Sequence, residues 1–252
     1  MGQPCLGATS SWTAPAGQRP WLARHAWKVA AQMLFKTHIV VVLMAVGAVA
    51  FAGPAQADVI DGTNEADVLV GTAHDDFIRG FDDDDELWGG GGRDQLRGGQ
   101  GDDRLVPGKG VDFEQMLGGG GNDTAISDAL PDYLAGGFGN DRLLGRGEGD
   151  WLEGSAGRDL LSGGAERDFH APGYGADTVL GGDGRDYVLV FTDNTASRAS
   201  APDVIDCGPG EDTVALLDGT VDPNDEYINC ENIRENGRMG ARVERLRNRF
   251  MH

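Results

Sequence analysis

The sequence predicts an all-β fold in which short strands recur every nine residues and two repeats complete one coil. Counted in nines from Gly62, fifteen units keep this register within residues 62–215, with interruptions at 107–117 and 190–197. Position six is Asp in all of them, and position eight is aliphatic in thirteen, Ala125 and His170 being the exceptions. A nine-residue period that persists over fifteen units indicates a solenoid and excludes a flexible acidic linker.

Each position that recurs from repeat to repeat has a physical role. Positions seven to nine are expected to form a short strand with position eight buried, because alternate residues of a strand face opposite sides. Glycines at positions one, two and four allow positive φ and close backbone approach. Carboxylates at position six, with turn carbonyls, form an oxygen-only shell that suits Ca²⁺ rather than Zn²⁺ or copper.

The repeats resemble the RTX, or hemolysin-type, calcium-binding nonapeptide repeat, G-G-x-G-x-D-x-U-x, where U is a large aliphatic residue. The copies nearest to this consensus are GGGGRDQLR, GGQGDDRLV, GGFGNDRLL and GGDGRDYVL, and the resemblance covers residues 59–215. It implies a parallel β-roll, a right-handed β-solenoid with two nonapeptides per coil, in which each ion lies between a turn and the next turn on the same side. Degenerate turns weaken some sites, so we expect roughly five to nine bound Ca²⁺.

Thirteen aspartates at position six are the expected Ca²⁺ ligands. They are Asp67, Asp76, Asp85, Asp94, Asp103, Asp123, Asp141, Asp150, Asp159, Asp168, Asp177, Asp186 and Asp212.

The energetics favour folding that depends on Ca²⁺. Each buried aliphatic side chain contributes about 1.5–3 kcal/mol, whereas ordering costs about 1–2 kcal/mol per residue. Stacked carboxylates repel one another when no ion is present. We therefore expect the metal-free chain to be largely unfolded, and Ca²⁺ at roughly 10⁻⁴–10⁻³ M, as for extracellular modules, to fold it.

Residues 1–57 are expected to be a secretory signal peptide. Lys36 and His38 precede an apolar run at 39–52, which ends in the small-x-small pattern Ala55-Gln56-Ala57. Met33 is an alternative start that gives a signal of conventional length. The run of about 14 residues is short for a span of about 20, although a signal anchor is the alternative. We expect a secreted or cell-surface chain that begins at Asp58 and is not an integral membrane protein.

Charge and cysteine content agree with export. The formal charge of −20 divides into +4 for residues 1–57, −28 for 58–233 and +4 for 234–252, which argues against nucleic acid as a partner. Cys207 and Cys230 are the only cysteines after residue 57. An even pair in an exported chain predicts one disulfide, with two unpaired thiols as the alternative. The disulfide would close a C-terminal cap at residues 216–233.

Two further features have alternative readings. Residues 234–252 form a basic tail with apolar residues at helical spacing, predicted to pack on the roll or to bind an anionic surface. Position seven, expected to point outward, carries an aromatic stripe that either binds a polysaccharide or protein or forms a stabilising ladder covered by the tail. The stripe consists of Phe77, Tyr133, Trp151, Phe169 and Tyr187.

Catalytic signals are missing from the sequence. It contains no G-x-S-x-G, no H-E-x-x-H and no G-x-x-x-x-G-K-[ST] motif. His170 falls at an interior position, where we expect a core histidine with a local hydrogen bond. We therefore expect no enzymatic activity. The remaining classes are an extracellular adhesion or ligand-binding module and a structural or calcium-buffering envelope protein.

Overall fold

The computed structural model describes residues 57–110, 113–190, 201–217 and 223–235, all within one compact unit at residues 41–252. These residues form strands and turns, and none of them is helical. The all-β prediction is therefore confirmed. The described part of the chain also offers no helix with the length and apolarity needed to cross a membrane. The predicted signal peptide lies outside the described residues.

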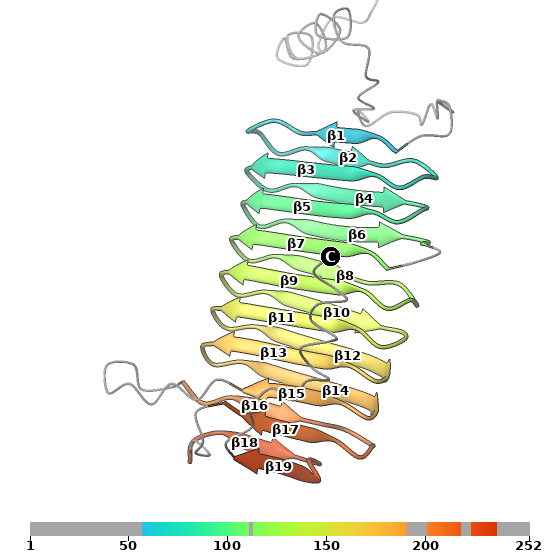
Figure 1. The fold of residues 1–252 in the computed structure, drawn as a ribbon. Helices are drawn as coiled ribbons and strands as arrows, with labels where there is room; N and C mark the ends of the chain where they lie inside the picture. Colours follow the sequence, from blue (N-terminus) through green and yellow to red (C-terminus); the bar gives the residue numbers. More distant parts are fainter. Residues whose placement is uncertain (1–56, 111–112, 191–200, 218–222, 236–252) are drawn as a thin grey trace, which may run out of the picture. The chain divides into compact units, whose positions relative to one another are not determined.

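The strands form two parallel sheets, one from the odd-numbered and one from the even-numbered strands (Figure 1). The odd sheet, in spatial order, is β1 (Val59–Asp61), β3 (Phe77–Asp82), β5 (Gln95–Gln100), β7 (Gln115–Gly120), β9 (Tyr133–Phe138), β11 (Trp151–Ala156), β13 (Phe169–Tyr174), β15 (Tyr187–Val190), β17 (Thr213–Leu216) and β19 (Asn232–Glu235). The even sheet is β2 (Val68–Val70), β4 (Glu86–Gly90), β6 (Arg104–Gly108), β8 (Thr124–Ile126), β10 (Arg142–Arg146), β12 (Leu160–Glu166), β14 (Thr178–Gly184), β16 (Val204–Asp206) and β18 (Glu226–Ile228).

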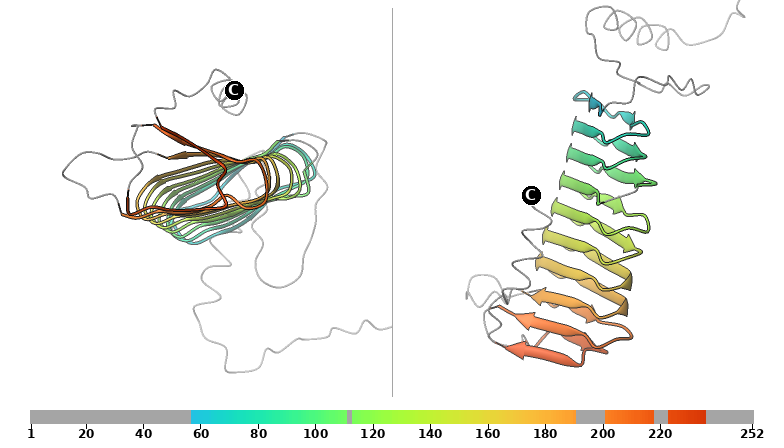
Figure 2. Two further views of the ribbon diagram at one scale, coloured as in Figure 1. Left: turned by 90° about the horizontal axis from the view of Figure 1, so that it is seen from below. Right: turned by 45° about the vertical axis from the view of Figure 1, so that its right-hand side comes forward.

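The pairing register confirms two nonapeptides per coil. Phe77 pairs with Gln95 in the odd sheet, and Leu143 pairs with Leu161 in the even sheet, both at the predicted offset. Viewed along the coil axis, the two sheets are the long sides of a flattened coil and the turns lie at its narrow ends (Figure 2). The chain is thus a parallel β-solenoid of about nine turns.

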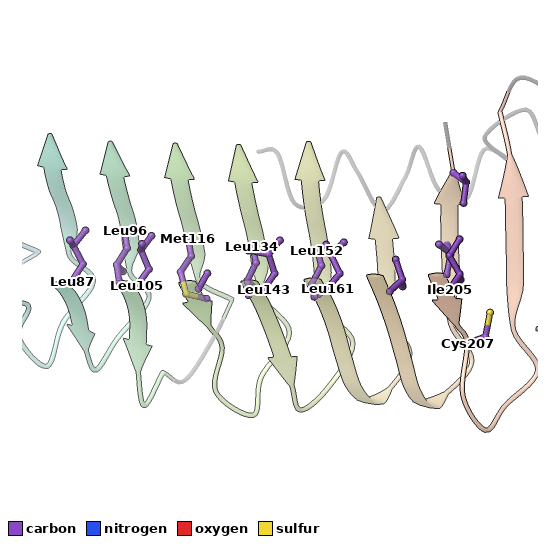
Figure 3. Packing of buried hydrophobic residues seen from close by; sticks show 14 of the residues in the cluster. Leu87, Leu96, Leu105, Met116, Leu134, Leu143, Leu152, Leu161, Ile205 and Cys207 are labelled. Atoms are coloured by element: carbon purple, nitrogen blue, oxygen red, sulfur yellow. The ribbon is translucent and has the colours of Figure 1, made fainter. Parts of the chain in front are cut away.

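Position eight of the repeat supplies the core between the sheets. Leu96 from β5 and Leu105 from β6 are fully buried, and corresponding residues from successive coils continue the row (Figure 3). Strands such as β4 alternate buried and more exposed residues, as period-two packing requires. Met116 completes the row at the interrupted unit.

His170 is a core residue, but it lacks the expected hydrogen bond. The side chain is fully buried, and neither imidazole nitrogen has a hydrogen-bond partner in the described part of the chain. Burial lowers the pKa of His170 to about 3, so the ring is neutral at physiological pH.

The segment predicted as a cap extends both sheets by one more coil. β18 pairs with β16 and β19 pairs with β17, all parallel. The predicted Cys207–Cys230 disulfide is confirmed, with a Cα–Cα distance of 5.2 Å. Cys207 is fully buried and belongs to the core, so the disulfide ties the last coil to the one before it. The tail beyond residue 235 lies outside the described residues.

Candidate metal centres

Two columns of carboxylates run along the two turn edges of the roll, each carboxylate directly preceding a strand. One column precedes the odd strands and consists of Asp58, Asp76, Asp94, Glu114, Asp132, Asp150, Asp168, Asp186, Asp212 and Glu231. The other precedes the even strands and consists of Asp67, Asp85, Asp103, Asp123, Asp141, Asp159, Asp177, Asp203 and Asp225. All thirteen predicted ligands lie in these columns.

After the first aspartate of each column, one oxygen of each aspartate is held by the turn one coil earlier on the same edge. The amide N–H of Asp123 donates to Oδ1 of Asp141 over 2.8 Å, and the amide of Asp141 donates to Oδ1 of Asp159 over 2.9 Å. This ladder repeats at successive coils along both columns. It fixes the orientation of each carboxylate and stacks like charges at every coil.

The second oxygen is left without a partner in most turns. In eleven of the buried aspartates, Oδ2 accepts no hydrogen bond within the described part of the chain. We call the corresponding turns the open turns; their aspartates are Asp85, Asp94, Asp103, Asp123, Asp141, Asp150, Asp159, Asp168, Asp177, Asp186 and Asp212. A buried, unpaired carboxylate oxygen is costly, so this row fits a bound cation.

Glycine at position one leaves space beside that oxygen. A Cβ at Gly145 would lie closer than 3.0 Å to both Oδ2 of Asp150 and the carbonyl oxygen of Gly163 in the next coil. The same pair of contacts recurs at Gly163, with Asp168 and Gly181. These two open turns therefore bring a carboxylate oxygen and a carbonyl oxygen together against a glycine that has no room for a side chain. Such hard oxygen donors fit Ca²⁺.

Positions two and four, rather than position one, use the conformational freedom of glycine. Gly137 and Gly139 have φ values of 117° and 123°, which L-residues rarely adopt. Some degenerate turns force other residues into this region, among them Phe81 at 93° and Arg146 at 76°. These substitutions add backbone strain but leave the aspartate in its column.

Burial raises the pKa values of the open carboxyls. Desolvation, opposed by the backbone hydrogen bond and reinforced by neighbouring aspartates, raises the pKa to about 7 for Asp94, Asp123 and Asp159. The same causes raise the pKa of Asp150 to about 9. Without a metal these groups tend to hold protons; bound Ca²⁺ would supply the positive charge that offsets the stacked carboxylates.

The first two predicted ligands lie in turns of a different kind. Oδ2 of Asp67 accepts hydrogen bonds from the amide and hydroxyl of Thr63, at 2.6 and 2.9 Å. Oδ2 of Asp76 accepts the corresponding bonds from Thr72, at 2.6 and 3.0 Å. In these threonine turns, residues 62–67 and 71–76, the oxygen that is free in the open turns is already engaged by protein.

Four aromatic residues of the predicted stripe form a continuous row in the odd sheet. Tyr133, Trp151, Phe169 and Tyr187 pair in register from β9 to β15, with ring centroids 4.0 Å apart for Trp151–Phe169 and 5.5 Å for Phe169–Tyr187. The first three are only 5–7% exposed, so the row is a packed cluster, as in the ladder alternative. Phe77 lies apart in β3, against Arg79 and Arg97.

Sequence reasoning missed several members of the columns. Counting back in nines from Gly62 and Gly118 would have placed Asp58 and Glu114 at position six. Asp225 and Glu231 follow spacings of 22 and 19 residues, which hide them from a nine-residue count. Their oxygens nevertheless accept the amide N–H groups of Asp203 and Asp212. The columns thus reach into the predicted cap.

Comparison with known families supports the assignment. The model of the RTX calcium-binding nonapeptide repeat matches residues 55–80, 61–96, 79–114, 117–148, 144–169 and 173–189. No curated protein gave a match. The family match covers more than half of the chain and includes every open carboxylate except Asp212. The chain therefore belongs to the RTX calcium-binding nonapeptide repeat family, and calcium binding by a β-roll follows from that membership.

Proposed function

We propose that this chain is an exported calcium-binding protein whose β-roll folds when Ca²⁺ binds. The observation that carries the proposal is the row of buried Oδ2 atoms without hydrogen-bond partners along both turn edges. Metal-free, the folded roll must either hold protons there or leave charges buried and unpaired. The unfolded chain pays neither cost, so ion binding and folding are coupled.

Far-UV circular dichroism of residues 58–252, which retain all described strands, tests this coupling. We expect a coil spectrum in calcium-free buffer and a cooperative transition to β structure near millimolar Ca²⁺, with Mg²⁺ as the control. Mg²⁺ should fail because it requires near-octahedral geometry and releases water reluctantly. A β-rich spectrum in calcium-free buffer that Ca²⁺ does not change would contradict the proposal.

Export is supported by the N-terminal apolar run and by the Ala55-Gln56-Ala57 pattern. Low cytosolic Ca²⁺ would keep the chain unfolded until it reaches millimolar Ca²⁺ outside. N-terminal sequencing of the product released by a secreting host is the test, with Asp58 as the expected first residue. Recovery of the chain with the apolar run at 39–52 still attached would favour a signal anchor.

We further propose a binding rather than a catalytic role. The carboxylates that an enzyme could use are already accounted for by the turn columns, and the sequence lacks common hydrolase and nucleotide-binding motifs. An adhesion role that uses the aromatic stripe is less well supported, because Trp151 and Phe169 are each only 5% exposed.

A further inference from the structure

Two neighbouring turns on the odd edge break the repeat pattern together. The turn before β7, within residues 107–114, belongs to a unit two residues longer than the others, and it carries Glu114 at position six. The turn before β9, residues 127–132, reads Ser-Asp-Ala-Leu-Pro-Asp in place of the glycine-rich pattern. β7 and β9 are paired, with Gln115 opposite Tyr133, so the two irregular turns are adjacent. Neither turn has the usual glycine at position one of the repeat.

Glu114 departs from the hydrogen-bond ladder of its column. It is 1% exposed, yet neither Oε1 nor Oε2 accepts a hydrogen bond within the described residues. Its own amide still donates to Oδ1 of Asp132 over 2.8 Å. The backbone therefore keeps the register, while the longer side chain carries both oxygens away from the ladder.

Three carboxylates converge where the ladder is broken. One ligand oxygen from each of Glu114, Asp128 and Asp132 lies within 4.8 Å of the other two. Ser127 Oγ donates to Asp132 Oδ2, and the amide of Leu130 donates to Asp128 Oδ1 over 2.8 Å. Neither of the salt bridges found in the described part of the chain involves these acids. The cluster therefore concentrates negative charge around a buried, unpaired glutamate.

We propose that Glu114, Asp128 and Asp132 form a separate Ca²⁺ site, built from side-chain carboxylates instead of glycine-turn carbonyls. Oxygen-only ligands and the part-exposed Asp128, which leaves room for water, suit Ca²⁺. Both oxygens of Asp128 and of Asp132 already accept hydrogen bonds, whereas both oxygens of Glu114 are unpaired, so Glu114 would be the principal ligand of this site. The proposal does not depend on ion-coupled folding of the roll.

The test is the number and affinity of bound ions in the full chain from Asp58, measured by equilibrium dialysis with ⁴⁵Ca²⁺. Glu114→Gln removes the buried charge with little change in shape, and Asp128→Asn alters the part-exposed ligand. Glu148→Gln is the matched control, because Glu148 is an exposed glutamate in the next turn along the same edge. We expect each site variant to bind one ion fewer than wild type, whereas the control binds as many ions as wild type.

Equal numbers of bound ions in Glu114→Gln, Asp128→Asn and Glu148→Gln would contradict a Ca²⁺ site at this cluster. Circular dichroism at saturating Ca²⁺ shows whether each variant keeps the roll; if Glu114→Gln does not fold, Asp128→Asn decides. The two proposals fail separately. A roll that folds without Ca²⁺ would contradict coupled folding but leave the one-ion difference intact. A roll that folds only with Ca²⁺, but whose site variants bind as many ions as wild type, would contradict only this site.

Discussion

The threonine turns and the open turns share the aspartate column but differ at a single carboxylate oxygen. In the threonine turns, the amide and hydroxyl of Thr72 both donate to Oδ2 of Asp76. In an open turn, Oδ2 of Asp159 accepts no hydrogen bond from the described residues, while Oδ1 is held in both cases. Position six is therefore necessary for a metal site but not sufficient.

The difference originates at position two of the repeat. In the open turns the residue there has positive φ, whether it is glycine, as at Gly137 (117°), or another residue, as at Ser155 (79°), whereas Thr63 and Thr72 remain outside that region. A threonine in ordinary backbone geometry brings its own donors to the aspartate, as in other local side-chain-to-backbone motifs. The backbone conformation at position two thus distinguishes turns that satisfy their carboxylate with protein from those that leave it unpaired.

The largest expected effect comes from adding a side chain at the position-one glycine of an open turn. A Cβ at Gly136 would lie closer than 3.0 Å to Oδ2, Cγ and Cβ of Asp141, whereas at Gly91 the nearest atoms are 3.6 and 3.7 Å away. Gly136→Ala should destabilise the calcium-loaded roll by about 3 kcal/mol or more, and Gly91→Ala by less than about 0.5 kcal/mol. Thermal unfolding in Ca²⁺ measures both effects. Similar melting temperatures for the two variants would contradict the requirement for glycine at position one.

A second prediction compares the two kinds of turn directly. Asp159→Asn keeps the Oδ1 acceptor but replaces the open oxygen by an amide nitrogen, which cannot bind a cation. We expect it to bind one Ca²⁺ fewer per chain by equilibrium dialysis, because that site weakens by at least about tenfold, equivalent to about 1.4 kcal/mol. Asp76→Asn should leave the number of bound ions unchanged, although losing the hydrogen bonds from Thr72 costs about 1–3 kcal/mol of stability. Equal losses of bound ions in the two variants would remove the distinction.

The open turns also predict an unusual pH dependence. The pKa values of Asp94 and Asp123 are raised to about 7, so the metal-free folded state binds more protons than the unfolded chain. The stability of the metal-free roll is therefore fully present below the unfolded pKa of about 4 and is lost as pH rises through about 7.

Circular dichroism in calcium-free buffer should show β structure increasing as pH falls from about 8 to about 4. The high negative charge acts in the same direction, so the titration is repeated in about 0.5 M NaCl, which screens exposed charges more than buried ones. A pH response abolished by salt would assign it to the surface charge. Loss of β structure on acidification would contradict buried open carboxyls altogether.

The repeat period made most of the roll predictable from sequence. Strand register follows from the aspartate and aliphatic columns, because a one-residue slip would expose the whole core row. The Cys207–Cys230 pairing was also predicted, from cysteine number and probable export rather than from geometry. These features depend on long-range periodicity or on residue counts, which the sequence states directly.

Features that depend on local side-chain geometry were not predictable in the same way. Thr72 occupies Oδ2 of Asp76 through a turn conformation that the repeat consensus does not contain. Glu114 was hidden by the two extra residues of its unit, although its register follows from Gly118. Trp151 sits at an outward position but is only 5% exposed and packs with Tyr133 and Phe169. Alternation predicts which way a side chain points, not what covers it.

The smallest and most specific prediction converts one kind of turn into the other. Thr72→Gly removes the hydroxyl donor and permits positive φ at position two, so Oδ2 of Asp76 should become available to an ion. The cost is about 1 kcal/mol for the lost hydrogen bond. We expect one more bound Ca²⁺ per chain by equilibrium dialysis, whereas Thr72→Val, which disfavours positive φ at that position, should bind no additional ion. If Thr72→Gly binds no additional ion, the residue at position two does not decide occupancy, and the neighbouring coil at the end of the roll must do so instead.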